Sequence, residues 1–193
     1  MPERKIYDQY GLNFVTFTIV DWVDIFTRKV YCDLILESLK YCQREKKLHI
    51  HAFVIMSNHV HLVVSAEEDN CKLSDIIRDF KKFTSKKIVK TIKLTPESRR
   101  KWMLEVFEEN GRNNSDNEKY QVWQQGTGVV GLWSMKIIWQ KINYIHFNPV
   151  KAGWVFEPQD YVYSSAGAYL ANQKCLVDID FLPPIRPVKW FWY

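Results

Sequence analysis

Two histidines stand two residues apart inside an otherwise apolar run, Met56–Ser65 (MSNHVHLVVS). Successive side chains of a strand point to opposite faces of a sheet, so His59 and His61 are expected on one face and Val60 and Leu62 on the other. The run therefore predicts a strand, and two adjacent imidazoles make half of a metal site. Because a metal needs at least one further ligand, the alternative for this pair alone is two partly buried, hydrogen-bonded histidines.

The first two thirds of the chain alternate between strand-like and helix-like apolar spacing. Period-2 alternation or β-branched runs predict strands at Leu12–Val20 and Leu48–Met56, and Ser57–Asn58 would turn the second of these back as a hairpin with the histidine segment. Helical spacing covers Val30–Lys46 and Leu73 to about Lys90. The order β, α, β, β, α indicates helices packed against one antiparallel sheet.

The last third has a weaker pattern. Glu108–Lys119 is polar and is interpreted as a loop, Tyr120–Gln124 as a short strand, and the glycine-containing stretch Gly126–Gly131 as a turn. Ser134 is expected to cap a helix that runs to Phe147, since the residue before Pro149 avoids the α conformation. We therefore predict an α+β fold with a βαββαβ core, an added helix, one domain over residues 1–170, and a C-terminal tail over 171–193.

Composition limits the class of protein. With 193 residues, of which 47% are hydrophobic, the chain can bury a substantial core. No apolar run approaches the roughly 20 residues of a membrane span, and the start is charged without an apolar segment behind it. The four cysteines form no C-x-x-C pair. We expect a cytoplasmic protein with no membrane partner and reduced thiols.

Positive charge is concentrated in one segment. Arg78–Lys101 holds ten Lys or Arg against Asp79 and Glu97, a net +8, whereas the whole chain carries +5 and the remainder therefore about −3. Such a run is either a solvated helix face or a track for nucleic-acid phosphates. On this second reading Arg78, Lys81, Lys82 and Lys86 are candidate DNA-binding residues.

The late helix carries a polar stripe. Gln140, Lys141, Tyr144 and Asn148 recur three or four residues apart, away from an apolar stripe of isoleucines. Taken alone, Tyr144 is an amphipathic residue with its hydroxyl in water. The neighbouring residues, a lysine one turn before and an amide one turn after, favour a functional role for Tyr144. Lys141 is therefore added to the candidate DNA-binding residues.

Four segments together resemble one known family: HAFVIMSNHVHLVVS (51–65), VWQQG (122–126), QKINYIHFNPVKAGWV (140–155) and YVYSSAGAY (161–169). They are similar, in this order, to the IS200-like single-tyrosine (Y1) transposases, in particular the REP-associated branch. The resemblance implies a ferredoxin-like HUH endonuclease fold, a divalent metal, Mg²⁺ or Mn²⁺, and single-stranded DNA with hairpin-forming repeats as partner. It leaves open whether the protein is a monomer or a homodimer.

The family's functional residues transfer to four positions. The resemblance implies that His59 and His61 bind the metal, that Tyr144 is the nucleophile, and that Asn148 is the third metal ligand. One departure is visible, because Gly126–Val130 lacks the Asn-His pair found in many relatives. This leaves open any DNA contact that the loop usually supplies.

These residue types suit cleavage of a DNA strand that is later rejoined. A side-chain oxygen can preserve the energy of the phosphodiester bond in a covalent intermediate, whereas water cannot. We therefore expect a metal-dependent transposase that cleaves and rejoins DNA through a 5′-phosphotyrosine at Tyr144. The alternatives are a domesticated, non-catalytic hairpin-binding or regulatory protein, and a hydrolytic phosphodiesterase or RNA-binding module.

Other histidines are candidates of lower rank. His49 and His51 are also two apart on a strand, and they are interpreted as surface or hydrogen-bonded histidines. His146 lies on the helix roughly opposite Tyr144 and is interpreted as a packing or capping histidine rather than a ligand.

Overall fold

A four-stranded antiparallel sheet forms the centre of the computed structural model, which describes residues 6–68, 70–112, 119–126 and 128–183. The strand order is β2-β3-β1-β4, and every neighbouring pair is antiparallel. The strands are β1 (Asn13–Thr18), β2 (Leu48–Ile55), β3 (His59–Ala66) and β4 (Gly128–Gly131). With its packed helices, this sheet confirms the α+β, ferredoxin-like fold predicted from the sequence.

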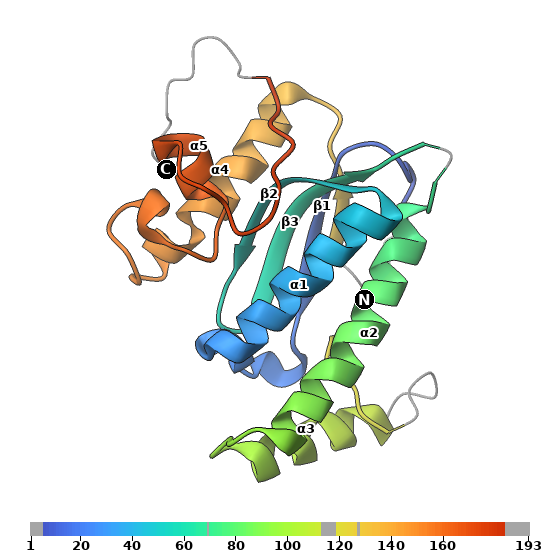
Figure 1. Ribbon diagram of the computed structural model, residues 1–193. Helices are drawn as coiled ribbons and strands as arrows, with labels where there is room; N and C mark the ends of the chain where they lie inside the picture. Colours follow the sequence, from blue (N-terminus) through green and yellow to red (C-terminus); the bar gives the residue numbers. More distant parts are fainter. Residues whose placement is uncertain (1–5, 69, 113–118, 127, 184–193) are drawn as a thin grey trace.

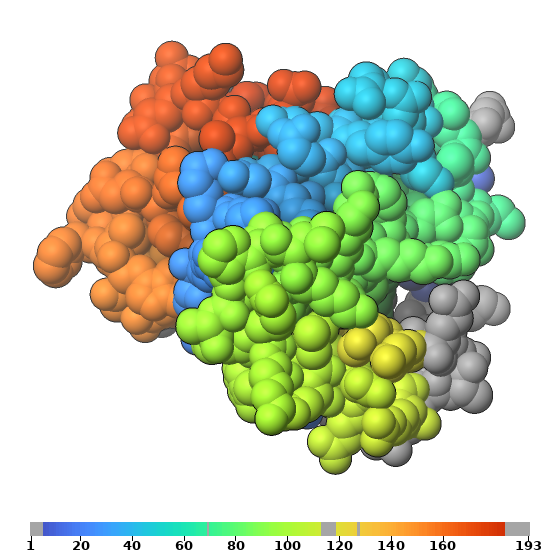
Figure 2. Space-filling view, turned by 60° about the horizontal axis from the view of Figure 1, so that its bottom comes forward, coloured from blue at the N-terminus to red at the C-terminus, as the bar shows by residue number. Residues whose placement is uncertain are grey.

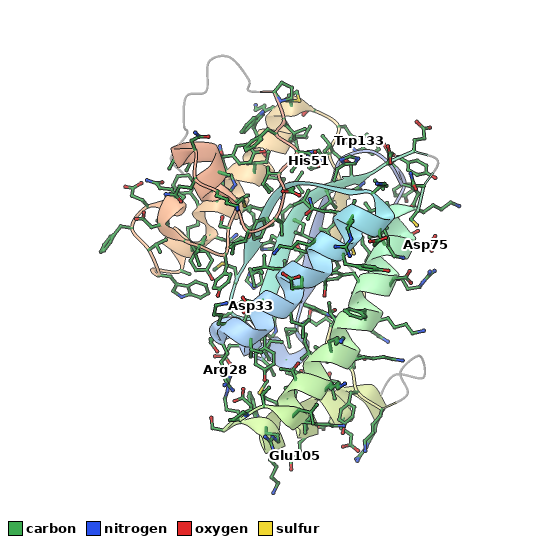
Figure 3. The ribbon with its side chains drawn as sticks, in the orientation of Figure 1. Arg28, Asp33, His51, Asp75, Glu105 and Trp133 are labelled. Atoms are coloured by element: carbon green, nitrogen blue, oxygen red, sulfur yellow. The ribbon has the colours of Figure 1, made fainter. Side chains whose placement is uncertain are left out.

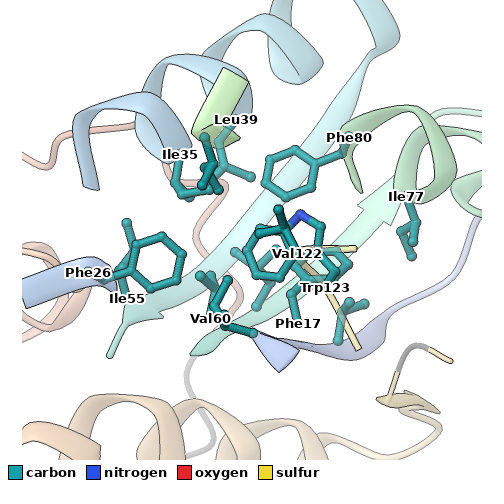
Figure 4. Close-up of a cluster of buried hydrophobic side chains, with 14 of the residues drawn as sticks. Phe17, Phe26, Ile35, Leu39, Ile55, Val60, Ile77, Phe80, Val122 and Trp123 are labelled. Carbon is teal, nitrogen blue, oxygen red and sulfur yellow. The ribbon is translucent and has the colours of Figure 1, made fainter. Parts of the chain in front are cut away.

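One face of the sheet is covered by α1 (Lys29–Lys46) and α2 (Leu73–Leu94), which lie side by side in Figure 1. Alternate residues of the strands point to this face, so Val15 and Phe17 of β1 share a buried cluster with Val60 of β3. Both helices add their apolar stripes to it (Figure 4), through side chains that include Ile35, Leu39, Ile76, Ile77 and Phe80. This cluster is the larger of the two parts of the core.

The opposite face of the sheet is covered by α4 (Met135–Lys151). Phe14, Val54 and Val63 point to this face and pack with a stripe on the helix, Ile138, Ile142 and Ile145. The side chains of β1 and β3 that face α4 are those adjacent in sequence to the ones facing α1 and α2. Because His59 and His61 alternate with Val60 along β3, they lie on the opposite face of the sheet and face α4.

The histidine strand begins at the predicted hairpin. Ser57 and Asn58 form the turn between β2 and β3, and the backbone N–H of Met56 donates to the carbonyl of His59 at 2.8 Å. The register of β3 against β1 pairs Thr16 with His61 and Thr18 with His59. The turn fixes the register of β3 against β2, whereas the separate pairing of β3 with β1 decides which residues of β1 flank the histidines.

The sequence pattern predicted that the late helix would end at Phe147, before Pro149. The helix instead continues to Lys151, with Pro149 inside it. Ser134 caps its start, with the hydroxyl accepting from the Ile137 N–H at 3.4 Å. The end is a Schellman motif: Gly153 is left-handed at φ +73°, and the backbone N–H of Trp154 donates to the carbonyl of Pro149 at 3.0 Å. In the last turn Pro149 forfeits a single helical bond, so the glycine rather than the proline ends the helix.

Replacing Gly153 with alanine is expected to lower the free energy of unfolding by about 1–2 kcal/mol. No heavy atom lies within 4 Å of the Cβ that alanine would add, so the cost is the left-handed backbone alone. Urea denaturation of Gly153→Ala measures it. Gly153→Asn is expected to lose less, because asparagine tolerates this conformation better; equal losses for both variants would contradict the assignment.

Two expectations for the middle of the chain were wrong. Residues 100–112 form a helix, α3 (Arg100–Arg112), where the polar stretch from Glu108 was interpreted as a loop; its buried stripe is narrow, chiefly Met103 and Phe107, and its polar residues form the solvated face. The fourth strand is Gly128–Gly131, most of the stretch that was expected to be a turn. The expected strand Tyr120–Gln124 contributes one isolated bridge, from Trp123 to Ile19. Residues 113–118 and Thr127 lie outside the described residues.

The described part of the tail packs along the edge strand β2. After the short helix α5 (Ala166–Ala171), the chain returns to this edge, where the Asp180 N–H donates to the Ile50 carbonyl at 2.9 Å. Val177 is buried in the main cluster. In Figure 2 the residues after α4 lie on one side of the molecule and α3 on the other, with part of α1 between them. None of the described helices combines the length and apolar character that crossing a membrane requires.

Candidate active site

The two histidines of β3 lie next to each other on the α4 face of the sheet. Their ring centroids are 4.7 Å apart, and the rings meet edge to face. His61 is 6% exposed and His59 is partly buried. The predicted alternation is confirmed, since Val60 between them is fully buried in the cluster on the other face.

Tyr144 of α4 lies directly against this pair. Its ring centroid is 5.3 Å from that of His61 and 6.0 Å from that of Phe14, which in turn stacks on His61 at 5.2 Å. The tyrosine is 40% exposed, so its side chain reaches both the histidines and solvent. The helix and the hairpin, about eighty residues apart in the chain, thus bring one phenol and two imidazoles to a single place.

Both imidazoles are neutral around pH 7 in this setting. Burial, together with the neighbouring His59 and the Lys141 ammonium, lowers the pKa of His61 to about 3. Burial also lowers the pKa of His59. A neutral imidazole offers a nitrogen lone pair, which is the form that binds a metal.

One nitrogen of each ring is engaged by a neighbouring side chain. His61 Nδ1 lies 2.9 Å from the hydroxyl of Thr16 on β1, and His59 Nδ1 lies 2.7 Å from Oδ1 of Asn58. Metal-binding histidines in proteins are commonly held in this way through the nitrogen that does not bind the ion. Sequence reasoning missed Thr16 and Asn58 in this role, although the antiparallel register of β1 and β3 places Thr16 opposite His61.

The side chains that could hold a divalent metal are the two imidazoles and the amide of Asn148. In the described ranges no group of three or more His, Cys, Asp or Glu gathers. Asn148 lies one turn after Tyr144, and its Nδ2 donates to the Tyr144 carbonyl at 3.1 Å. Its Oδ1 is the atom that could bind an ion. Two imidazoles and an amide oxygen would leave coordination positions open for further ligands, unlike a closed structural zinc site.

Two lysines flank Tyr144. The Nζ of Lys141 is 5.6 Å from the centre of the tyrosine ring and 4.7 Å from that of Phe14. The Nζ of Lys151 is 5.9 Å from the tyrosine ring. Sequence reasoning picked out Lys141 but missed Lys151, which the continuation of α4 past Pro149 brings onto the same side. Together they make the surroundings of the tyrosine electropositive.

The basic segment lies elsewhere. Arg78, Lys81, Lys82 and Lys86 are on α2, which packs on the face of the sheet opposite Tyr144. Arg78 is paired with Asp75 at 2.7 Å, and Lys81 donates to the Gln124 carbonyl at 2.9 Å, whereas Lys82 and Lys86 are exposed. Figure 3 shows Asp75 on the outer side of α2. These residues therefore do not line the histidine and tyrosine cluster.

The second histidine pair has structural partners. His51, labelled in Figure 3, donates from Nδ1 to the carbonyl of Asp180 at 2.7 Å, and its Nε2 lies 2.9 Å from the Ser65 hydroxyl. His49 Nδ1 lies 3.1 Å from a carboxylate oxygen of Asp180. Both rings hold the C-terminal segment on the edge of β2, which agrees with the interpretation as hydrogen-bonded histidines.

His146 packs in the interior, on the side of α4 away from solvent. It is 1% exposed, and its Nε2 lies 2.8 Å from the Ser165 hydroxyl. Burial lowers its pKa to about 3. The ring thus joins α4 to the segment that precedes α5 and stays neutral there.

Acid is expected to destabilise the protein through His146. Its folded-state pKa of about 3 lies below the ordinary 6.5, so between these two values the unfolded chain binds a proton that the folded chain does not. Stability is therefore lost as the pH falls through this window, by about 2 kcal/mol from this group between pH 7 and pH 5. Denaturant unfolding at the two pH values should show a smaller difference for His146→Gln. An unchanged difference would contradict the assignment.

Fold and site together define a ferredoxin-like protein whose sheet carries a His-x-His pair beside a helix tyrosine. Residues 15–110 match the family model described as "Transposase IS200 like". Through this domain, about half of the 193 residues, the chain belongs to the IS200-like transposase family. The matched segment contains His59 and His61, whereas Tyr144 lies beyond it.

One solved structure shares the fold over a longer span than the family model. A REP-associated tyrosine transposase bound to a REP hairpin superimposes with a TM-score of 0.65 at 18% identity, covering 96% of this chain and 98% of that one. A candidate transposase from Deinococcus radiodurans R1 has a TM-score of 0.45 at 15% identity, covering 75% of this chain and 95% of that one. No match was found among curated proteins.

Proposed function

We propose that this protein is a metal-dependent single-tyrosine transposase that cleaves and rejoins single-stranded DNA, with Tyr144 as nucleophile. One observation carries the proposal: the Tyr144 ring lies 5.3 Å from that of His61, which in turn lies 4.7 Å from that of His59. Family membership supports DNA transposition as the general role. In this proposal Tyr144 would supply the nucleophile for that role, and His59 and His61 would bind the cation.

The proposed substrate is single-stranded DNA that folds back into hairpins. Support comes from the structural relative of the same fold that is bound to a REP hairpin. The charge around Tyr144 suits such a ligand, because Lys141 and Lys151 can neutralise phosphates next to the reacting one. The exposed lysines of α2 would contact a strand only where it continues around the edge of the sheet.

The reaction is a transfer of one phosphodiester bond. The Tyr144 oxygen attacks phosphorus, its proton passes to solvent, and the bond from phosphorus to the 3′-oxygen breaks. The leaving oxygen takes up a proton and becomes a 3′-hydroxyl, while the downstream fragment stays on Tyr144 as a 5′-phosphotyrosine. Attack by a second 3′-hydroxyl then restores a phosphodiester and frees the tyrosine, so no bond energy is lost to water.

The cation would be held by His59 and His61 through Nε2, with Asn148 Oδ1 as the proposed third ligand. When bound, a divalent ion polarises the phosphoryl oxygens and offsets the charge that develops in the transition state. The chain's own part is to keep the imidazoles neutral and to present the phenol from a rigid helix. Phe14 contributes by packing against both His61 and Tyr144.

The test is a search for a covalent DNA adduct. A pool of hairpin oligonucleotides with randomised loops and flanks, labelled at either the 5′ or the 3′ end, is incubated with the protein and Mn²⁺. The proposal expects the 3′ label to become linked to protein under denaturing conditions and the 5′ label to appear in free fragments ending in a 3′-hydroxyl. The pool samples many hairpin sequences at once.

The same assay separates the rival functions. Cleavage of the 5′-labelled and of the 3′-labelled oligonucleotides, without any label linked to protein, would favour a hydrolytic phosphodiesterase. Enrichment of particular hairpins by binding, without cleavage, would favour a domesticated regulatory protein. Either result would overturn the role proposed for Tyr144.

A further inference from the structure

Asn58 links the ring of His59 to the backbone of a neighbouring turn. Its Oδ1 lies 2.7 Å from His59 Nδ1, and its Nδ2 lies 3.2 Å from the carbonyl oxygen of Trp22. The same turn is tied to the hairpin a second time, because the Ile19 N–H donates to the Asn58 carbonyl at 2.9 Å. One side chain therefore bridges the proposed metal ligand and a separate element.

The partners of Asn58 leave a single consistent arrangement of protons. A backbone carbonyl can only accept a hydrogen bond, so the NH₂ of Asn58 must face Trp22 and its Oδ1 must face His59. An amide oxygen also only accepts, so His59 must carry its proton on Nδ1. In the neutral ring Nε2 then holds the lone pair, which is the atom free to bind a cation.

The neighbouring histidine lacks such a constraint. His61 Nδ1 meets the hydroxyl of Thr16 at 2.9 Å, and a hydroxyl can donate or accept. The Thr16 contact therefore accommodates either tautomer of His61. The two rings, 4.7 Å apart, differ in how firmly the protein sets their protons.

The turn that holds Asn58 has an unfavourable backbone. Asp21 and Trp22 are consecutive non-glycine residues at φ +49° and +57°, a left-handed conformation that costs roughly 1–2 kcal/mol for each. Hydrogen bonds hold the turn in place, among them the bond from the Trp22 N–H to the Ile19 carbonyl at 3.2 Å and the bond from the Asn110 amide to Asp21 at 2.7 Å. This conformation supplies the carbonyl that orients Asn58.

We propose that Asn58 is a positioning residue that fixes His59 in the Nδ1–H tautomer before any cation binds, whereas the tautomer of His61 is selected by the cation through rotation of the Thr16 hydroxyl. The consequence for metal binding rests on the proposed function. The tautomer of His59 does not, because it follows from hydrogen bonds within the protein. Asn58 thus prepares one half of the site in advance.

The experiment is a long-range ¹H–¹⁵N spectrum of the metal-free protein with ¹⁵N-labelled histidine at pH 7.5. His59, assigned by the loss of its signals in His59→Gln, is expected to show Nδ1 protonated and Nε2 unprotonated. Asn58→Ala is expected to give averaged shifts of a tautomer mixture. Asn70→Ala, which removes an exposed asparagine bonded to Glu67 beyond the other end of β3, is the matched control and should leave His59 unchanged.

Calorimetric titration with Mn²⁺ then tests the consequence. Asn58→Ala is expected to weaken Mn²⁺ binding about 10- to 100-fold relative to wild type and to Asn70→Ala. An Nε2–H or mixed tautomer for His59 in the wild type would overturn the inference, as would unchanged Mn²⁺ affinity in Asn58→Ala. A wild type with the expected tautomer that binds no Mn²⁺ would overturn the metal site in the proposed function while supporting the role of Asn58 toward His59.

Discussion

Tyr144→Phe is expected to abolish the covalent DNA adduct and to reduce strand cleavage at least about 10³-fold. The change removes one oxygen, the atom that would bond to phosphorus, and keeps the ring that packs against His61 and Phe14. Since the side chain is 40% exposed, its loss of a hydroxyl should leave stability nearly unchanged. Adduct formation is measured with the 3′-labelled hairpin pool in Mn²⁺, and folding by thermal denaturation.

The matched control is Tyr41→Phe. Tyr41 is also a half-exposed helix tyrosine, but it lies on α1, which packs on the other face of the sheet. It is expected to form the adduct at the wild-type rate. DNA binding without Mn²⁺ should be equal in all three proteins. An adduct that persists in Tyr144→Phe would mean that another oxygen is the nucleophile.

His61→Ala is expected to lose Mn²⁺ binding and to lower cleavage at least about 10³-fold. Of the two histidines, His61 is the more deeply buried, and it is the one whose ring touches both Tyr144 and His59. Its removal would take away a ligand and part of the packing around the tyrosine. Calorimetry with Mn²⁺ measures the first effect and the adduct assay the second.

His49→Ala controls for the loss of a strand histidine. His49 faces Asp180 at the edge of β2 and makes no part of the Tyr144 cluster. It should bind Mn²⁺ and cleave DNA as the wild type does. Because His61→Ala leaves a buried gap, His61→Gln is a second variant of similar size. If either folded variant of His61 kept wild-type Mn²⁺ affinity, the proposed metal site would be wrong.

The sequence by itself determined strands β1, β2 and β3, helices α1 and α2, most of α4, and the face of β3 that carries the histidines. Period-2 alternation places His59 and His61 opposite Val60 whatever the rest of the chain does, because successive side chains of a strand point to opposite faces. Helical spacing likewise separated Tyr144 from Ile142 and Ile145. These features depend on neighbours close in the chain, which is why local patterns were sufficient.

Only the tertiary structure decided what surrounds these residues. The distance between Tyr144 and His61 depends on α4 packing on the face opposite α1 and α2, and the same arrangement removes the basic segment of α2 from the cluster. Asn58 and Thr16 acquired partners through the approach of the turn at Trp22 and the register of β1. The end of α4 was set by the left-handed Gly153 rather than by Pro149. Contacts between segments far apart in the chain leave no periodic signal, so spacing along the sequence could not reveal them.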